Sequence, residues 1–316
     1  MVTSNRKQQL FDKFSQQLSL LKENGLLDID LAFDKTYICP ICLRQFSEEA
    51  LVADGTMDFL TEEDAPPASL GGTRIALTCK RCNSECGHKI DFQLKELLEY
   101  DENRRFVPGK LQFGTIDFEG KPVTVQLVSE GGGQLKATHK LRTNNPQTLR
   151  AFIASVKSGS TLVFNHKKHR LDTRKINYAI LKTNYIITFS KFGYIFLLDP
   201  AYDIIRRQIL HPEEELISHD LSVHNNDLKP YVGTHYVLTP ELKSIFNIFS
   251  LTTEFSQRIY GAFLPVPTIP LPTFVQEARK RTQGQSLLFD KSNYDDFVDL
   301  FTDVASMRQI KTWATA

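Results

Sequence analysis

The sequence lacks several features that would place it in a familiar class. It has no stretch of about 18 apolar residues and no apolar run near its first residues, so we expect neither a membrane span nor a secretory signal. It also has no phosphate-binding glycine loop, no serine or cysteine triad signature and no internal repeat. The sequence therefore predicts a soluble cytoplasmic protein without a membrane partner.

A surplus of charge of either sign is missing as well. The 38 basic and 37 acidic residues leave a formal net charge of +1, which argues against wholesale nonspecific binding of nucleic acid. A local basic patch can still bind DNA in a neutral protein. With 41% hydrophobic and 24% charged residues in 316 positions, the composition is typical of a globular protein with one or two domains.

Cysteine is scarce, but four of the five cysteines form two Cys-x-x-Cys motifs. Cys39 and Cys42 make the first, and Cys79 and Cys82 follow after 36 intervening residues. Each motif places two sulfurs on one side of a tight turn, so the pair predicts one tetrahedral structural zinc. Two unrelated pairs of buried cysteines are the alternative, and disulfides are disfavoured because nothing marks the chain as secreted. We interpret Cys86 as core filler.

The residues between and after the motifs predict two strands and a helix. An extended segment ends at Glu63 and Asp64, where Pro66 keeps its predecessor out of a helix. A loop with two glycines leads to a short buried strand at 75–78. A helix capped by Asn83 or Ser84 follows, and its apolar face comprises Ile90, Leu94, Leu97 and Leu98. The prediction is a ββα unit built around a zinc site.

This segment resembles the zinc-containing branch of the HNH endonucleases, whose fold is the ββα-metal finger. In that family the first strand ends in an acidic residue and a histidine, followed by a proline and a glycine-containing loop, and the second strand leads into Cys-x-x-Cys-Asn. The corresponding residues here are Glu63-Asp64-Ala65-Pro66, Ser69-Leu70-Gly71-Gly72 and Cys79-Lys80-Arg81-Cys82-Asn83. The resemblance covers about a fifth of the chain and says nothing about the remainder.

The resemblance implies a catalytic site with one substitution. Asp64 stands where the family has its general-base histidine, and an unperturbed aspartate, with a pKa near 3.9, is the weaker base. Asp64 and Asn83 would hold one Mg²⁺ or Mn²⁺ ion against a phosphate, with Glu63 or His88 assisting. The alternatives are that Asp64 caps a turn and that His88 is an exposed helix residue.

We divide the chain into three parts and expect an α+β fold. Residues 1–30 hold an amphipathic helix, predicted at 5–23, and residues 31–100 hold the finger. Residues 101–316 read as an α+β domain with an antiparallel sheet and helices. In that domain a three-stranded meander precedes a helix that starts at Asn145-Pro146, and a longer helix is predicted at 173–192.

The densest basic cluster lies at 165–175. Its cations would lie along a phosphate backbone if they contact nucleic acid, and the residues that we assign to this role are Lys167, Lys168, Arg170 and Arg174. A solvated loop is the alternative interpretation.

Two functions from different classes follow. The first is a metal-dependent HNH-type endonuclease that hydrolyses DNA phosphodiester bonds, for example in phage defence or restriction, and that is restrained by a protein partner or activator. The second is a non-catalytic, zinc-stabilised module that binds nucleic acid or protein. A nuclease needs its metal ligands to converge, whereas in a degenerate finger the same groups are turned away or bonded to the backbone.

Overall fold

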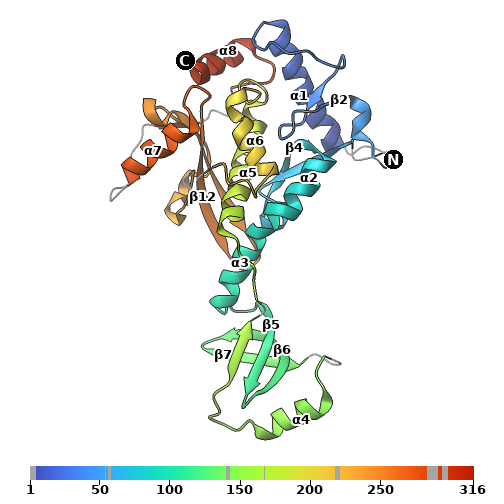
Figure 1. Cartoon of the computed structure of the whole chain (residues 1–316), viewed down its shortest axis with the longest axis vertical. Coiled ribbons are helices and arrows are strands. Elements are labelled where there is room, and N and C mark those ends of the chain that lie inside the picture. The colour runs from blue at the N-terminus through green and yellow to red at the C-terminus, as the bar shows by residue number, and fades with distance from the viewer. Residues whose placement is uncertain are drawn as a thin grey trace. The chain divides into compact units, whose positions relative to one another are not determined.

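The structure is a computed structural model of the whole chain, and it describes residues 5–53, 55, 58–139, 143–166, 168–217, 221–282, 291–293 and 298–316. The chain forms two compact units (Figure 1). Unit 1 comprises Met1–Leu94, Asp172–Thr253 and Gln257–Ala316, and unit 2 comprises Lys95–Leu171 and Glu254–Ser256. Both are α+β with antiparallel sheets, which confirms the predicted fold class at that level.

The units divide the chain differently from the predicted domains. The chain leaves unit 1 within a helix after Leu94 and returns at Asp172, so unit 2 is an insertion. Residues after 172 belong with the predicted finger because the helix at Thr173–Phe192 packs on strands of the finger and on strands near residue 250. One buried helix thus joins two segments that the sequence presents as separate domains.

The N-terminal part of unit 1 contains the predicted finger. The helix α1 (Asn5–Glu23) has the predicted bounds and packs its apolar face on β1 and β4. The first short hairpin is β1 (Tyr37–Ile38) with β2 (Gln45–Phe46), and the second hairpin is β3 (Leu60–Ala65) with β4 (Thr73–Cys79). The helices α2 (Lys80–Cys86) and α3 (Phe92–Arg104) follow, joined by a π-helical turn at Gly87–Asp91.

The start of α2 differs from the prediction. We expected Asn83 or Ser84 to cap this helix, but its first residue is Lys80 and its N-cap is Cys79, whose sulfur accepts a hydrogen bond from the Cys82 amide. A cysteine sulfur replaces the usual Asn or Ser oxygen at this position. The second Cys-x-x-Cys motif is therefore the first turn of the helix.

The remainder of unit 1 is a five-stranded antiparallel sheet with helices. Its strands run in the order β13 (Lys291–Asn293), β10 (Gly233–Val237), β11 (Ser244–Thr252), β12 (Gln257–Pro265) and β9 (Ser222–His224). The central helix α5 (Thr173–Phe192) begins and ends as predicted and packs on β11 and β12 (Figure 1). The other helices are α6 (Asp203–Leu210), α7 (Leu271–Thr282) and α8 (Val304–Thr315).

Unit 2 contains a four-stranded sheet, a helix of its own and residues Lys95–Arg104 of α3. Its strands lie in the order β7 (Gln134–His139), β6 (Lys121–Gly131), β5 (Leu111–Phe118) and β8 (Val163–His166), all antiparallel. The helix α4 (Pro146–Ser155) is capped by Asn145 as predicted. Its Leu149 and Phe152 pack on a core of Ile116, Val123 and Val125, so one face of the sheet is covered.

Candidate metal centre and the predicted catalytic residues

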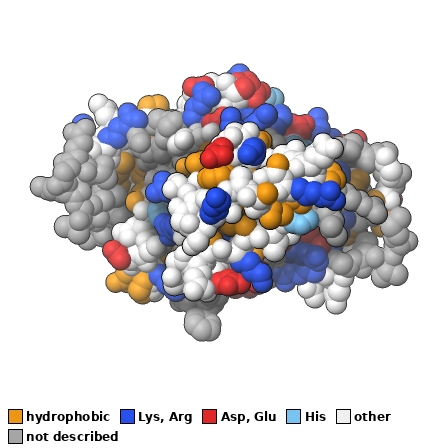
Figure 2. Space-filling view, turned by 90° about the horizontal axis from the view of Figure 1, so that it is seen from below, with side chains coloured by type: hydrophobic (Ala, Val, Ile, Leu, Met, Phe, Trp, Pro, Cys, Tyr) orange, Lys and Arg blue, Asp and Glu red, His pale blue; other side chains and the backbone are white. Residues whose placement is uncertain are grey.

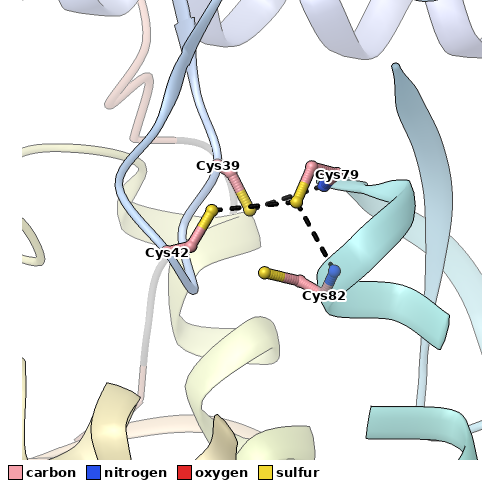
Figure 3. Close-up of side chains that lie close together, drawn as sticks. All are labelled: Cys39, Cys42, Cys79 and Cys82. Atoms are coloured by element: carbon pink, nitrogen blue, oxygen red, sulfur yellow. Dashed lines mark hydrogen bonds between the residues drawn. The ribbon is translucent and has the colours of Figure 1, made fainter. Parts of the chain in front are cut away.

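The first cysteine pair lies in the tight turn of the β1–β2 hairpin. The Cys39 amide donates to the Arg44 carbonyl at 2.9 Å, and the Leu43 amide donates to the Cys39 carbonyl at 2.9 Å. Leu43 adopts a φ of 58°, a left-handed conformation that is uncommon for residues other than glycine. This turn places both sulfurs of the pair on the side that faces the start of α2 (Figure 3).

The second pair completes a four-cysteine cluster. The sulfur atoms of Cys39, Cys42, Cys79 and Cys82 all lie within 4.8 Å of one another. The Cys42 and Cys79 sulfurs are 3.7 Å apart, which matches the ~3.8 Å separation expected in a tetrahedral site with Zn–S bonds of about 2.3 Å. All four are free thiols. The side chains therefore fit a structural metal ion such as zinc, as the spacing predicts.

The electrostatics of the cluster favour a cation. A hydrogen bond from Cys39 lowers the pKa of Cys42 to about 6, so this thiol loses its proton near neutral pH. The neighbouring cysteines also lower the pKa of Cys79, whereas burial raises the pKa of Cys39 and the hydrogen bond with Cys39 raises the pKa of Cys82, so the negative charge lies on Cys42 and Cys79. The Arg44 guanidinium interacts with the sulfurs of both residues, and its own pKa is raised as a result. Arg44 thus offsets part of the negative charge that a four-thiolate site carries.

Cys86 takes no part in this cluster. Its side chain is fully buried one turn beyond Cys82, and burial raises the pKa of its thiol to about 12. A thiol that stays protonated behaves as a small apolar group. The core-filler interpretation agrees with this environment.

Three buried tyrosines hold the metal centre in place, and the sequence analysis missed them. The Tyr185 hydroxyl donates to the Pro40 carbonyl at 3.0 Å, within the first Cys-x-x-Cys motif. The Tyr194 hydroxyl donates to the Ile38 carbonyl at 2.8 Å and accepts from the Ile38 amide at 2.9 Å. The Tyr37 hydroxyl bridges Leu77 of β4 in the same two ways. Only the tertiary structure reveals these partners, because they lie 40 or more positions apart in the sequence.

Glu63, a predicted catalytic residue, lies in a buried charge cluster. The Lys182 Nζ atom is 2.7 Å from Glu63 Oε1 and 2.6 Å from Asp91 Oδ2. The Thr78 hydroxyl donates to the second Glu63 oxygen at 2.7 Å. Both carboxylate oxygens of Glu63 are therefore bonded inside the protein, and its side chain is only 4% exposed.

The charges in this cluster depend on one another. Burial alone would lower the pKa of Lys182, but the Glu63 and Asp91 carboxylates outweigh it and raise that pKa, so the ammonium group stays charged. Burial raises the pKa of Glu63, and Lys182 opposes that shift. The sequence carries no distinctive signal for this cluster, because Lys182 is one of three lysines in a helix that also contains several Thr and Asn residues.

Asn83 and His88 are also placed for roles other than metal binding. The Asn83 amide donates to the Thr61 hydroxyl at 3.0 Å and to the Glu62 carbonyl at 3.1 Å, so it ties α2 to β3. His88 is exposed on the π-helical turn. Both residues thus have the features of the non-catalytic alternatives.

In contrast to Glu63, the Asp64 carboxylate forms no hydrogen bond or ion pair with the described residues. Asp64 is half-buried and follows a β-bulge in β3. Its register partner on the neighbouring strand β4 is Arg74. Partial burial raises the pKa of Asp64, and the Arg74 charge opposes that shift. A raised pKa makes an aspartate a better base.

Glu63, Asp64 and His88 do not share a group of three metal-ligand side chains within the described part of the chain. Among the described His, Cys, Asp and Glu side chains, two groups are close enough to share a metal ion: the four cysteines, and Glu96, Glu99 and His169 of unit 2. Neither group includes Glu63, Asp64 or His88.

The predicted nucleic-acid contacts have different environments. Lys167 lies outside the described residues, whereas Lys168 and Arg170 are exposed. Arg174 forms an ion pair with Glu215, and its Nε atom lies 3.7 Å from Asp172 Oδ1. The charge of Arg174 is therefore already compensated within the protein.

Comparisons of the chain with protein-family models, curated proteins and solved structures find no match. Among the helices that the structure describes, none combines the length and the apolar character needed to cross a membrane.

Proposed function

We propose that the protein binds single-stranded nucleic acid through unit 2 and that its metal centre is structural. The observation that carries this proposal is the distribution of charge along the chain. Residues 121–170 contain nine Lys or Arg residues and one acidic residue, Glu130, a surplus of eight positive charges. The remainder of the chain then holds 29 basic and 36 acidic residues. The nearly neutral total conceals a strongly basic segment, the usual electrostatic feature of a nucleic-acid-binding surface.

Several of these cations are available to a ligand. Arg150, Lys157 and Lys168 are exposed, and none of them pairs with an acidic side chain within the described parts of the chain. Figure 2 shows basic and apolar side chains side by side on the face seen there. Exposed cations bind phosphates by releasing counterions, and the affinity gained in this way falls with salt.

The sheet of unit 2 adds exposed apolar side chains. Strand register places Leu111 and Phe113 on the face opposite the covered core residue Ile116. Their side chains are 44% and 49% exposed. An exposed aromatic ring on an open sheet can stack on an unpaired base, a contact worth about 1 to 3 kcal/mol. Duplex DNA offers no such base face, which favours a single strand.

The environments of Glu63 and Asn83 support a structural role for the metal centre. Both Glu63 oxygens are bonded, one to Lys182 and one to Thr78, so Glu63 presents no free oxygen to a metal ion or a substrate phosphate. The Asn83 amide nitrogen is bonded to β3, which gives this side chain a structural contact.

The test is binding of a fluorescein-labelled single strand of about 20 nucleotides, as DNA and as RNA, followed by anisotropy between about 50 and 200 mM KCl. The test variant carries Arg150→Gln, Lys157→Gln and Lys168→Gln. We expect weaker binding and a salt slope smaller by about 2, since each lost phosphate contact removes about 0.7 from the slope on a single strand.

A matched control removes three exposed cations of unit 1 through Lys22→Gln, Lys229→Gln and Arg308→Gln. Equal losses in the two triple variants, or absence of binding by the unmodified protein at low salt, would contradict the proposal.

A second candidate is a metal-dependent phosphodiesterase at the predicted finger. It is favoured by the chain order β3, β4, α2 and by the raised pKa of Asp64, which suits a general base. Its test is nicking of plasmid and single-stranded DNA with Mg²⁺ or Mn²⁺ by the unmodified protein, Asp64→Ala and the exposed control Asp28→Ala. Nicking lost only in Asp64→Ala supports this candidate. Absence of nicking by protein that retains its zinc would exclude it under those conditions.

A further inference from the structure

Unit 2 contains a second group of metal-ligand side chains, away from the cysteines. Glu96, Glu99 and His169 each bring one ligand atom within 4.8 Å of the others. The two glutamates lie three positions apart on α3 and so share a helix face. His169 comes from the segment before α5, 73 positions from Glu96. From this convergence we propose that Glu96, Glu99 and His169 bind a divalent transition-metal ion.

The contacts of His169 suit a metal ligand. Its side chain is 8% exposed, and its Nδ1 atom lies 2.9 Å from Glu96 Oε2. The other ring nitrogen, Nε2, lies 3.0 Å from the Asn103 amide nitrogen. An asparagine amide can turn either its nitrogen or its oxygen to an imidazole, because the two orientations have the same shape. With the oxygen turned to Nε2–H, Nδ1 carries its lone pair toward the carboxylates, as metal-bound histidines do.

Charge and hydrogen bonding at the group favour a cation. Two carboxylates face one imidazole, and Lys95 lies beside them with its Nζ atom 3.6 Å from Glu99 Oε1. With its nitrogen toward His169, the Asn103 amide leaves its buried Oδ1 atom without a hydrogen-bond partner among the described residues, which favours the turned orientation. A divalent ion would neutralise the carboxylates and accept the Nδ1 lone pair that the turned amide leaves facing them.

The donor set indicates which ions fit. Imidazole suits zinc, iron, nickel and copper, whereas carboxylates suit harder ions such as Mn²⁺. One imidazole with two carboxylates therefore suits Mn²⁺, Fe²⁺ or Zn²⁺. Mn²⁺ is the useful probe because the thiolates of the cysteine cluster prefer softer ions.

The experiment titrates the full-length, zinc-loaded protein with Mn²⁺ and follows the free ion by electron paramagnetic resonance. We expect one saturable site, and we expect His169→Gln and Glu96→Gln each to weaken it at least about tenfold. Glu130→Gln, which removes an exposed carboxylate elsewhere in unit 2, is the matched control and should leave binding unchanged. Asp28→Ala, which removes an exposed carboxylate of unit 1, should also leave it unchanged.

A hydrogen-bonded Glu96–His169 pair without a metal gives a different result. In that case Mn²⁺ binding is absent, or equal in all variants, and the proposal is wrong. Should His169→Gln fail to fold, Glu99→Gln decides the question, because this side chain is 36% exposed and tolerates the change. Slower hydrogen exchange of unit 2 amides upon Mn²⁺ addition, absent in Glu99→Gln, provides a second readout.

Discussion

At the scale of single residues, the ion pairs of Lys182 determine whether Glu63 of β3 is available to a ligand. Its ammonium group lies between two carboxylates, and all three side chains are at most 14% exposed. A buried charge cluster of this kind adds little net stability, but removal of one member leaves the others uncompensated. Glu63 is therefore held by the protein interior and is not a reactive group.

We predict that Lys182→Met destabilises the protein by about 3 to 5 kcal/mol at neutral pH. The loss should shrink at about pH 4, because Glu63 without its cation takes up a proton in the folded state. Urea unfolding at the two pH values measures both effects. Lys175→Met, on the same helix but only half-buried, is the control and should change stability far less. A mild, pH-independent effect of Lys182→Met would show that the cluster is not charged.

We predict that Asp64→Asn, in contrast to Lys182→Met, stabilises the protein at neutral pH. The pKa of Asp64 is raised in the folded state, so its charged form opposes folding above that pKa, and this cost vanishes as pH falls below the unfolded value. The urea midpoint of Asp64→Asn should rise at neutral pH and match that of the unmodified protein near pH 3. The exposed control Asp28→Asn should show no such difference. A lower midpoint at neutral pH would mean that Asp64 makes favourable ionic contacts.

At the scale of elements, the backbone of the loop between β3 and β4 requires glycine at positions 71 and 72. Gly71 adopts a φ of 86°, which other residues rarely take. A Cβ atom on Gly72 would lie 1.5 Å from the Pro66 carbonyl oxygen, so no side chain fits there. The motif that resembles the HNH loop is thus required by backbone packing alone.

We predict that Gly72→Ala costs about 3 kcal/mol or more, because the backbone of Pro66 must move. Gly87→Ala is the matched control, since it lies in a helical turn with no atom within 4 Å of its Cβ position. That control should be neutral or stabilising by up to about 1 kcal/mol. Chemical denaturation of both variants measures the difference, and equal stabilities would contradict the steric argument.

At the scale of the whole molecule, the two units have separate cores. Unit 1 is built around α5 and the metal centre, and unit 2 around Ile116, Val123 and Val125. Units with separate cores can unfold independently.

We predict two calorimetric transitions that respond to different variants. Cys42→Ser removes a metal ligand and should lower only the transition of unit 1, with loss of bound zinc. Ile116→Ala should lower only the transition temperature of unit 2, because it reduces the stability of that unit by about 2 to 4 kcal/mol. Zinc content and scanning calorimetry of both variants make the test, with Cys86→Ala as a cysteine control that keeps its zinc. One shared transition in every variant would refute independent unfolding.

Local patterns in the sequence determined much of the secondary structure. The spacing of apolar residues predicted the bounds of α1 and α5, and Asn145-Pro146 predicted the start of α4. The two Cys-x-x-Cys motifs predicted a cluster that the structure assembles. These features depend on neighbours within a few positions, where periodicity and capping carry the information.

Only the tertiary structure decided the division into units and the roles of the acidic residues. Lys182 lies 119 positions from Glu63, and the packing of α5 on β3 brings them together. Without that contact, the sequence predicts that Glu63 assists Asp64 at a catalytic metal site. The same packing reunites the finger with residues beyond 172 and leaves unit 2 as an insertion. Long-range burial sets which charges are paired, and no local pattern encodes it.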